Sequence, residues 1–96
     1  MDSVTDEAFE HAVVAIVESI PSGETSTYGE VAQEAGFPGA ARAVGNLMRT
    51  VPGLPWWRVI TTTGRLVPGM EQEHTRRLRS EGIAVDDNRV VMASPR

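Results

Sequence analysis

The sequence of 96 residues contains no cysteine and no lysine, and no basic residue precedes Arg42. Without cysteine there is no disulfide, no thiolate nucleophile and no cysteine-ligated zinc site. The longest apolar run, Ala12 to Val17, is far below the roughly 20 residues that a membrane span requires. No signal peptide opens the chain, and the length suits one domain over residues 1–96. We therefore expect a soluble, cytoplasmic protein that does not bind membranes.

The charges are segregated along the chain. Residues 1–41 contain eight acidic residues and no base, whereas residues 42–96 contain nine arginines and five acidic residues. The net charge of −4 argues weakly against a nucleic-acid partner. A local basic face is nevertheless what phosphate contact requires, and the second half of the chain can supply one.

Hydrophobic spacing predicts three helices in the first half. Residues 6–20 carry an apolar stripe at three- and four-residue steps, with Thr5 placed to cap the helix. Thr27-Tyr28-Gly29-Glu30 matches a capping box and predicts a short second helix that ends at Gly36. After a Pro-Gly turn, a third helix is expected over residues 40–50. This order is typical of a helix-turn-helix.

The second half of the chain predicts short strands and one further helix. Aromatic and β-branched residues over 55–61 favour a strand, which a turn at Thr63-Gly64-Arg65 would connect to Leu66-Val67 as a hairpin. The pattern of residues 71–81 predicts a charged helix, and that of residues 89–92 predicts a last strand. The expected fold class is mainly α with a small β hairpin, similar to a winged helix-turn-helix.

Six short motifs together resemble the DNA-binding domain of the O6-alkylguanine-DNA alkyltransferases, over about Phe9 to Met92. They are Ile20-Pro21-x-Gly23, Ser26-Thr27-Tyr28-Gly29-Glu30-Val31-Ala32, Ala40-Ala41-Arg42-Ala43-Val44-Gly45, Pro55-x-x-Arg58-Val59-Ile60, Gly64-x-Leu66 and Glu81-Gly82. Those transferases carry Pro-Cys-His-Arg-Val, with the cysteine as alkyl acceptor. Here the same window reads Pro55-Trp56-Trp57-Arg58-Val59, so the sequence is closer to the alkyltransferase-like proteins, which lack that cysteine.

The two substitutions remove the chemistry of alkyl transfer. An acceptor needs a nucleophile and an activating base, and tryptophan offers only an indole N–H and a flat ring. Trp57 stands where the resemblance places the activating histidine, and Glu81 keeps the place of the glutamate that orients it. We therefore expect no enzymatic activity.

The resemblance implies a pocket for a flipped O6-alkylguanine, lined by Trp56, Trp57, Tyr28 and Arg58. If the two tryptophans lie on a strand, they face opposite sides, so one is expected in the pocket and the other packed or at the rim. Arg58 could instead form a buried ion pair with Glu81. An acid in the last turn of a helix opposes the helix dipole, which favours a specific partner for Glu81. Glu81 is thus expected to support the site structurally.

A second set of residues is expected at the DNA. Arg42 matches the family's arginine finger, which fills the space of the flipped base, and its small neighbours such as Ala41 allow close approach to the minor groove. Tyr28 is expected at the phosphate of the flipped nucleotide, although it could also simply pack the second helix. The further candidates are Ser26, Thr27 (which could equally be only a cap), Asn46 and Arg49.

The function implied is recognition of O6-alkylguanine in duplex DNA and marking of it for nucleotide excision repair, by a monomer associated with the nucleoid. No cofactor is expected. Metal binding is not expected either, because neither His11 nor His74 has ligand spacing to a second donor. One alternative is a winged-helix regulator that reads DNA sequence, for which only Asn46 and Arg49 are suitable side chains on the third helix. Another is an enzyme with new hydrolytic chemistry built on Glu81.

Overall fold

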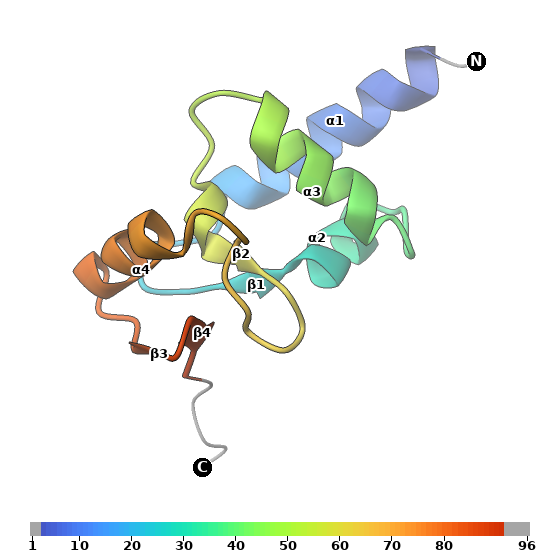
Figure 1. Cartoon of the computed structure of the whole chain (residues 1–96). Helices are drawn as coiled ribbons and strands as arrows, with labels where there is room; N and C mark the ends of the chain where they lie inside the picture. Colours follow the sequence, from blue (N-terminus) through green and yellow to red (C-terminus); the bar gives the residue numbers. More distant parts are fainter. Residues whose placement is uncertain (1–2, 92–96) are drawn as a thin grey trace.

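The computed structural model describes residues 3–91, in which four α-helices, one 3₁₀ helix (η1) and four very short strands follow one another. Helices α1, α2 and α3 gather on one side, and α4 lies on the other side with β3 and β4 (Figure 1). None of the helices in this described part has the length and hydrophobicity to cross a membrane. The elements are α1 (Ser3–Glu18), β1 (Ser26–Thr27), α2 (Tyr28–Glu34), α3 (Ala41–Thr50), η1 (Trp56–Arg58), β2 (Val59–Ile60), α4 (Glu71–Ser80), β3 (Val85–Asp86) and β4 (Arg89–Val90).

Helix α1 has the predicted buried stripe, but its ends differ from the prediction. It begins at Ser3, so Thr5 lies inside the helix and not at its cap. It ends at Glu18, and the Ile20 N–H then bonds to the Val17 carbonyl in a tighter turn. The cause is Pro21, because a residue that precedes proline is pushed out of the helical region.

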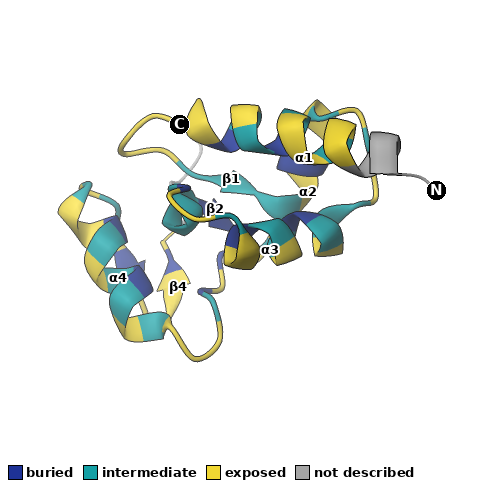
Figure 2. Ribbon diagram, turned by 90° about the horizontal axis from the view of Figure 1, so that it is seen from above, coloured by how far each residue is buried: buried dark blue, intermediate teal, exposed yellow. Residues whose placement is uncertain are grey.

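Helices α2 and α3 confirm the predicted helix-turn-helix. The capping box is present: the Thr27 hydroxyl accepts from the Glu30 N–H, and the Glu30 carboxylate accepts from the Thr27 N–H, both at 3.0 Å. Gly36, with φ of +90°, ends the α2 segment as expected. The buried residues of the helices face the interior, and exposed residues cover the outer sides (Figure 2).

The prediction of a strand over residues 55–61 is wrong for its first half. Trp56–Arg58 forms η1, in which the Arg58 N–H bonds to the Pro55 carbonyl, and only Val59–Ile60 is a strand. Strand propensity reflects how well a side chain packs on a half-buried surface. Here Trp56 and Trp57 are packed by tertiary contacts while their backbone is a 3₁₀ helix, so their strand propensity does not produce a strand.

The predicted hairpin of residues 59–67 is also wrong. β2 pairs in parallel with β1, a strand that the sequence did not predict. Leu66 instead donates its N–H to the Asn88 carbonyl, and the backbones of Arg65 and Arg89 form an isolated antiparallel β-bridge. The one hairpin within the described residues is β3–β4, whose turn residues Asp87 and Asn88 both have positive φ, as a type I′ turn requires. Of the predicted last strand, Arg89–Val90 is present, and Met92 lies outside the described residues.

The buried side chains form two clusters that meet at β2. Val59 belongs to the first, the helical core, and Ile60 to the second, the C-terminal core, because successive strand residues point to opposite sides. The helical core comprises Val13, Val17, Ile20, Val31, Ala32, Val44, Met48, Leu54 and Val59. The C-terminal core comprises Ile60, Leu66, Leu78, Val85 and Val90.

The capping box predicts the effect of one substitution. Thr27→Ala removes the acceptor of the Glu30 N–H, and we expect it to lower the free energy of unfolding by about 1 kcal/mol. Urea denaturation at neutral pH measures the difference. Thr62→Ala, at an exposed loop position, serves as the control and should change stability by less than about 0.5 kcal/mol. Equal effects of both substitutions would contradict the role of the cap.

Candidate nucleic-acid interface

A cavity of about 550 Å³ lies beside α3 and holds several of the predicted site residues. This volume is within the range of small-molecule sites, roughly 300–1,000 Å³. Trp56 supplies an aromatic wall, and Arg49 is the only charged side chain in the lining. The complete lining is Tyr28, Gly45, Met48, Arg49, Val51, Pro52, Gly53, Leu54, Trp56, Val67, Pro68 and Met70. A wider groove along α4 contains neither Trp56 nor Tyr28.

Trp56 is half-buried at the edge of the helical core. Its ring meets that of His74 at 5.0 Å with an interplanar angle of 61°, and that of Trp57 at 5.9 Å with an angle of 87°. Edge-to-face geometry of this kind is the one that aromatic rings prefer. The indole of Trp56 is therefore held by the rings of His74 and Trp57, and the Trp56 side chain also lines the cavity.

Tyr28, the first residue of α2, joins the cavity wall from a second direction. Its ring lies over α3 at Gly45, where a Cβ atom would be 3.9 Å from the Tyr28 Cε1 atom. Burial raises the pKa of the Tyr28 hydroxyl, and the positive charge of Arg49 partly opposes this effect. The hydroxyl therefore stays protonated at neutral pH and can donate a hydrogen bond.

The exposed face of α3 carries the predicted DNA-contacting residues. Arg42, Asn46 and Arg49 stand four and three residues apart, which places them on one side of the helix, and all three are exposed. The Arg49 guanidinium donates to the Asn46 side-chain oxygen. The Arg42 side chain makes no hydrogen bond or ion pair within the described residues, and Ala41 beside it is half-buried.

The hydroxyls of Ser26 and Thr27 are both engaged at the start of α2. Ser26 donates to the Glu30 carboxylate at 3.2 Å, and Thr27 is the cap. The capping role of Thr27 is thus confirmed, whereas its contact with phosphate stays a prediction.

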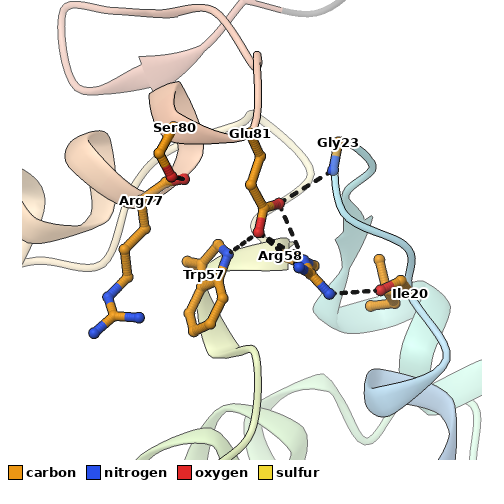
Figure 3. A network of polar contacts seen from close by, with 7 residues as sticks. All are labelled: Ile20, Gly23, Trp57, Arg58, Arg77, Ser80 and Glu81. Carbon is orange, nitrogen blue, oxygen red and sulfur yellow. Dashed lines mark hydrogen bonds and ion pairs between the residues drawn. The ribbon is translucent and has the colours of Figure 1, made fainter.

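Trp57 and Arg58 lie outside the cavity lining and join Glu81 in a separate network (Figure 3). The Trp57 indole N–H donates to Glu81 Oε2 at 2.9 Å, and Arg58 Nη2 approaches the same oxygen at 2.6 Å. Arg58 Nη1 donates to the Ile20 carbonyl at 2.8 Å, and the Gly23 N–H donates to Glu81 Oε1 at 3.1 Å. The alternative expectation for Arg58, a buried ion pair with Glu81, is therefore confirmed.

These donors lower the pKa of Glu81 to about 2, chiefly through the hydrogen bonds from Arg58, with Trp57 and Gly23 adding to the effect and burial opposing it. The carboxylate thus stays ionised over the whole physiological range. Trp57 is further held by Arg77, whose guanidinium lies 4.6 Å from the indole centroid. Such a cation–π contact favours an immobile ring.

The three arginines of α4 have partners on or near that helix. Arg76 and Arg77 both pair with Glu73 at 2.6 Å, and Arg79 donates to the Val85 carbonyl at 2.8 Å. Of these three arginines, Arg76 and Arg79 are exposed, whereas Arg77 is half-buried against the tryptophans.

Sequence reasoning missed His74, which is fully buried on α4. It precedes Leu78 by four residues and therefore shares the buried side of the helix, a spacing that could have indicated its position. Both ring nitrogens contact backbone groups: Nδ1 accepts from the Val67 N–H, and Nε2 lies 2.9 Å from the Trp57 carbonyl oxygen. Among residues 3–91, His, Asp and Glu side chains form no group of three that could hold a metal ion.

Comparison with known proteins identifies similar chains. The family described as "6-O-methylguanine DNA methyltransferase, DNA binding domain" matches residues 8–83. A "DNA base-flipping protein" of Vibrio parahaemolyticus is 40% identical over 80 residues, which cover 78% of this chain and 80% of that protein. "Alkyltransferase-like protein 1" of Schizosaccharomyces pombe is 37% identical over 87 residues, covering 83% and 80%. The crystal structure of S. pombe Atl1 with damaged DNA containing O6-carboxymethylguanine superposes with a TM-score of 0.74 at 36% identity, covering 81% of this chain and 79% of that one.

The Glu81 network predicts how stability depends on pH. A carboxyl group whose pKa is lower in the folded chain stabilises it above the unfolded-state pKa, and this contribution disappears as the pH falls through the folded-state value. We expect the network to contribute fully above about pH 4.5 and to lose about 3 kcal/mol as the pH falls toward 2.

Glu81→Gln tests this expectation by urea denaturation at several pH values. At pH 7 it leaves the largely buried Arg58 without a counter-charge and should cost about 3 kcal/mol. The matched control is Glu73→Gln, which breaks more exposed pairs with Arg76 and Arg77 and should lower the free energy of unfolding much less than Glu81→Gln does. An unchanged acid dependence in Glu81→Gln would show that Glu81 does not carry the effect.

Proposed function

The chain belongs to the family of the 6-O-methylguanine DNA methyltransferase DNA-binding domain, as an alkyltransferase-like protein, and from this premise we propose that it recognises alkylated guanine in duplex DNA without repairing it. The relatives named above support a DNA-damage role, since one is named a base-flipping protein and another was crystallised with damaged DNA. The single observation that carries the proposal is the cavity beside α3, with Trp56 as a wall and the exposed Arg42 and Arg49 on the helix at its side.

The cavity suits binding better than catalysis. Its lining is largely apolar, and the chain has no cysteine to accept an alkyl group. Trp56 presents π surface to a purine and its alkyl substituent. Stacking of a base on an aromatic side chain is worth roughly 1–3 kcal/mol, enough to offset much of the unstacking of a flipped base. Glu81, the remaining acid of the family motif, is bound by Arg58 and Trp57 and is not available as a base.

Arg42 and Tyr28 would assist the rotation of the nucleotide. In this proposal α3 lies along the minor groove, and the exposed Arg42 side chain enters the stack at the place of the flipped guanine. A guanidinium can stack on the flanking bases and donate to the orphaned partner base. The protonated hydroxyl of Tyr28, at the cavity wall, would donate to the phosphate of the same nucleotide.

Ser26, Thr27, Ala41, Asn46 and Arg49 would complete the contact with the DNA backbone around the cavity. Arg49 is both part of the lining and exposed, so it can reach the mouth of the site. We further propose, on the family resemblance alone, that the bound monomer marks the lesion for nucleotide excision repair proteins. No cofactor takes part in this scheme.

A binding titration tests the proposal. Matched duplexes with guanine or O6-methylguanine are compared at one salt concentration, because phosphate contacts make affinity depend on salt. We expect tighter binding of the lesion, quenching of tryptophan fluorescence, and no loss of methyl label from the DNA. Equal affinity for both duplexes, with selection of one sequence from random DNA, would favour a winged-helix regulator. Release of the alkyl group or base would establish an enzyme.

Two substitutions should separate the pocket from the groove contact. Trp56→Ala removes the stacking wall and should weaken binding to the lesion about 10- to 100-fold while changing binding to undamaged DNA little. Arg42→Ala should weaken both duplexes by a similar factor, about tenfold. Arg89→Ala, an exposed arginine on β4, is the control for general loss of charge. Equal losses on both duplexes for Trp56→Ala would count against a base pocket.

A further inference from the structure

His74 is the only fully buried polar side chain in the described part of the chain, and the proposed recognition of DNA does not use it directly. It lies on the inner side of α4, where its ring also packs against the ring of Trp56 at 5.0 Å. A buried imidazole is costly unless both nitrogens have partners, and here both have them.

The two hydrogen bonds determine the protonation state of the ring. Nδ1 accepts from the Val67 N–H at 3.1 Å and must therefore be unprotonated. Nε2 lies 2.9 Å from the Trp57 carbonyl oxygen, which only accepts, so Nε2 carries the proton and donates it. The neutral Nε2–H tautomer is thus the one that satisfies both contacts.

These contacts join two walls of the cavity. The Trp57 carbonyl belongs to η1, which carries Trp56, and Val67 starts the segment that lines the cavity through Met70. The backbone N–H of His74 also bonds to the Met70 carbonyl at 2.8 Å. One residue of α4 therefore contacts both segments at once.

We propose that His74 is a positioning residue that holds the Trp56 wall and the Val67–Met70 wall of the cavity at a fixed separation, and that its protonation in acid releases them. A proton added at Nδ1 would face the Val67 N–H, so two donors would meet without an acceptor. The hydrogen bond would break, and the segment would lose its tie to η1. The consequence for lesion binding rests on the proposed function.

The surroundings of His74 favour the neutral imidazole, so the ring is protonated only at acidic pH. Burial lowers the pKa of the imidazole, and the Trp57 carbonyl opposes this effect. The ionisable groups on the elements around it are Glu71, Glu73, Arg76, Arg77 and Arg79 on α4, Glu81 directly after it, Arg58 on η1, Arg65 before Leu66, Asp86 on β3 and Arg89 on β4. Glu73 and Arg58 are already committed to ion pairs, and Arg77 lies over the tryptophan rings. None of these groups takes the place of the backbone partners at the ring nitrogens.

The test compares lesion preference across pH 8 to 5 in the full chain. The preference is the ratio of the dissociation constants of the guanine and O6-methylguanine duplexes, so general effects of pH on DNA binding cancel. In the wild type we expect the ratio to fall about five- to tenfold in acid, the scale of one lost hydrogen bond. His74→Gln can accept from Val67 and donate to Trp57 without titrating, and its ratio should stay constant. His11→Gln, at the exposed second histidine, should keep the wild-type profile. A His74→Gln profile that falls like the wild type would overturn the proposal.

A measurement on the free wild-type protein separates this inference from the proposed function. The NMR signals of the Trp56 indole and the Val67 amide are followed together with those of the His74 ring as the pH is lowered. We expect all three to titrate with one midpoint. If the Trp56 and Val67 signals do not follow His74, the positioning role is wrong, whatever the protein binds. If they follow it while no duplex with a lesion is preferred at any pH, the positioning role holds and the sensor proposal fails.

Discussion

The ion pair between Arg58 and Glu81 is the contact on which the relation of the two cores depends. Glu81 caps the C-terminal end of α4, while Arg58 ends η1 and donates to the last turn of the α1 region at Ile20. Two charges removed from water are costly unless every donor and acceptor is satisfied. Here the carboxylate receives hydrogen bonds from Arg58, Trp57 and the Gly23 backbone. The network therefore joins three segments that are distant in the sequence.

The same network gives the Trp57 side chain a hydrogen-bond partner in the fold. By resemblance, a histidine at position 57 would be oriented by the glutamate and would activate a cysteine at position 56. The indole of Trp57 has one N–H, and it reaches the same carboxylate. The hydrogen bond between Trp57 and Glu81 is a structural contact in this chain, and the neighbouring Trp56 supplies an aromatic wall of the cavity.

The sequence predicts local features of this fold well and distant pairing poorly. The stripe of α1, the capping box at Thr27 and the need of Glu81 for a partner all depend on neighbours along the chain or on the helix dipole, and all three are present. The hairpin at residues 59–67 fails because β2 finds its partner in β1, and strands of two residues are too short to show an alternating pattern.

In the candidate site, too, some residues follow from sequence motifs and others depend on distant contacts. Family motifs indicate Trp56 and Tyr28, and Arg49 is a further DNA-contacting candidate on the third helix. The structure brings these three residues around one cavity, whereas Trp57 and Arg58 lie outside it. Their roles toward DNA stay predictions. For His74, the spacing to Leu78 indicates the buried side of α4. Its hydrogen-bond partners, however, are backbone groups of distant segments, and no side-chain pattern predicts them.

The pairing of β1 with β2 has a consequence for the geometry of the cavity. β1 ends where Tyr28 begins α2, and β2 begins where η1 ends, so Ser26 opposite Val59 and Thr27 opposite Ile60 set the offset between Tyr28 and Trp56. A slip by one residue would exchange Val59 and Ile60 between the two cores and displace Trp56 by about 3.3 Å relative to Tyr28. The register of two residues on each strand thus determines the width of the site. Because Val59 and Ile60 are buried in different cores, only one register is compatible with the fold.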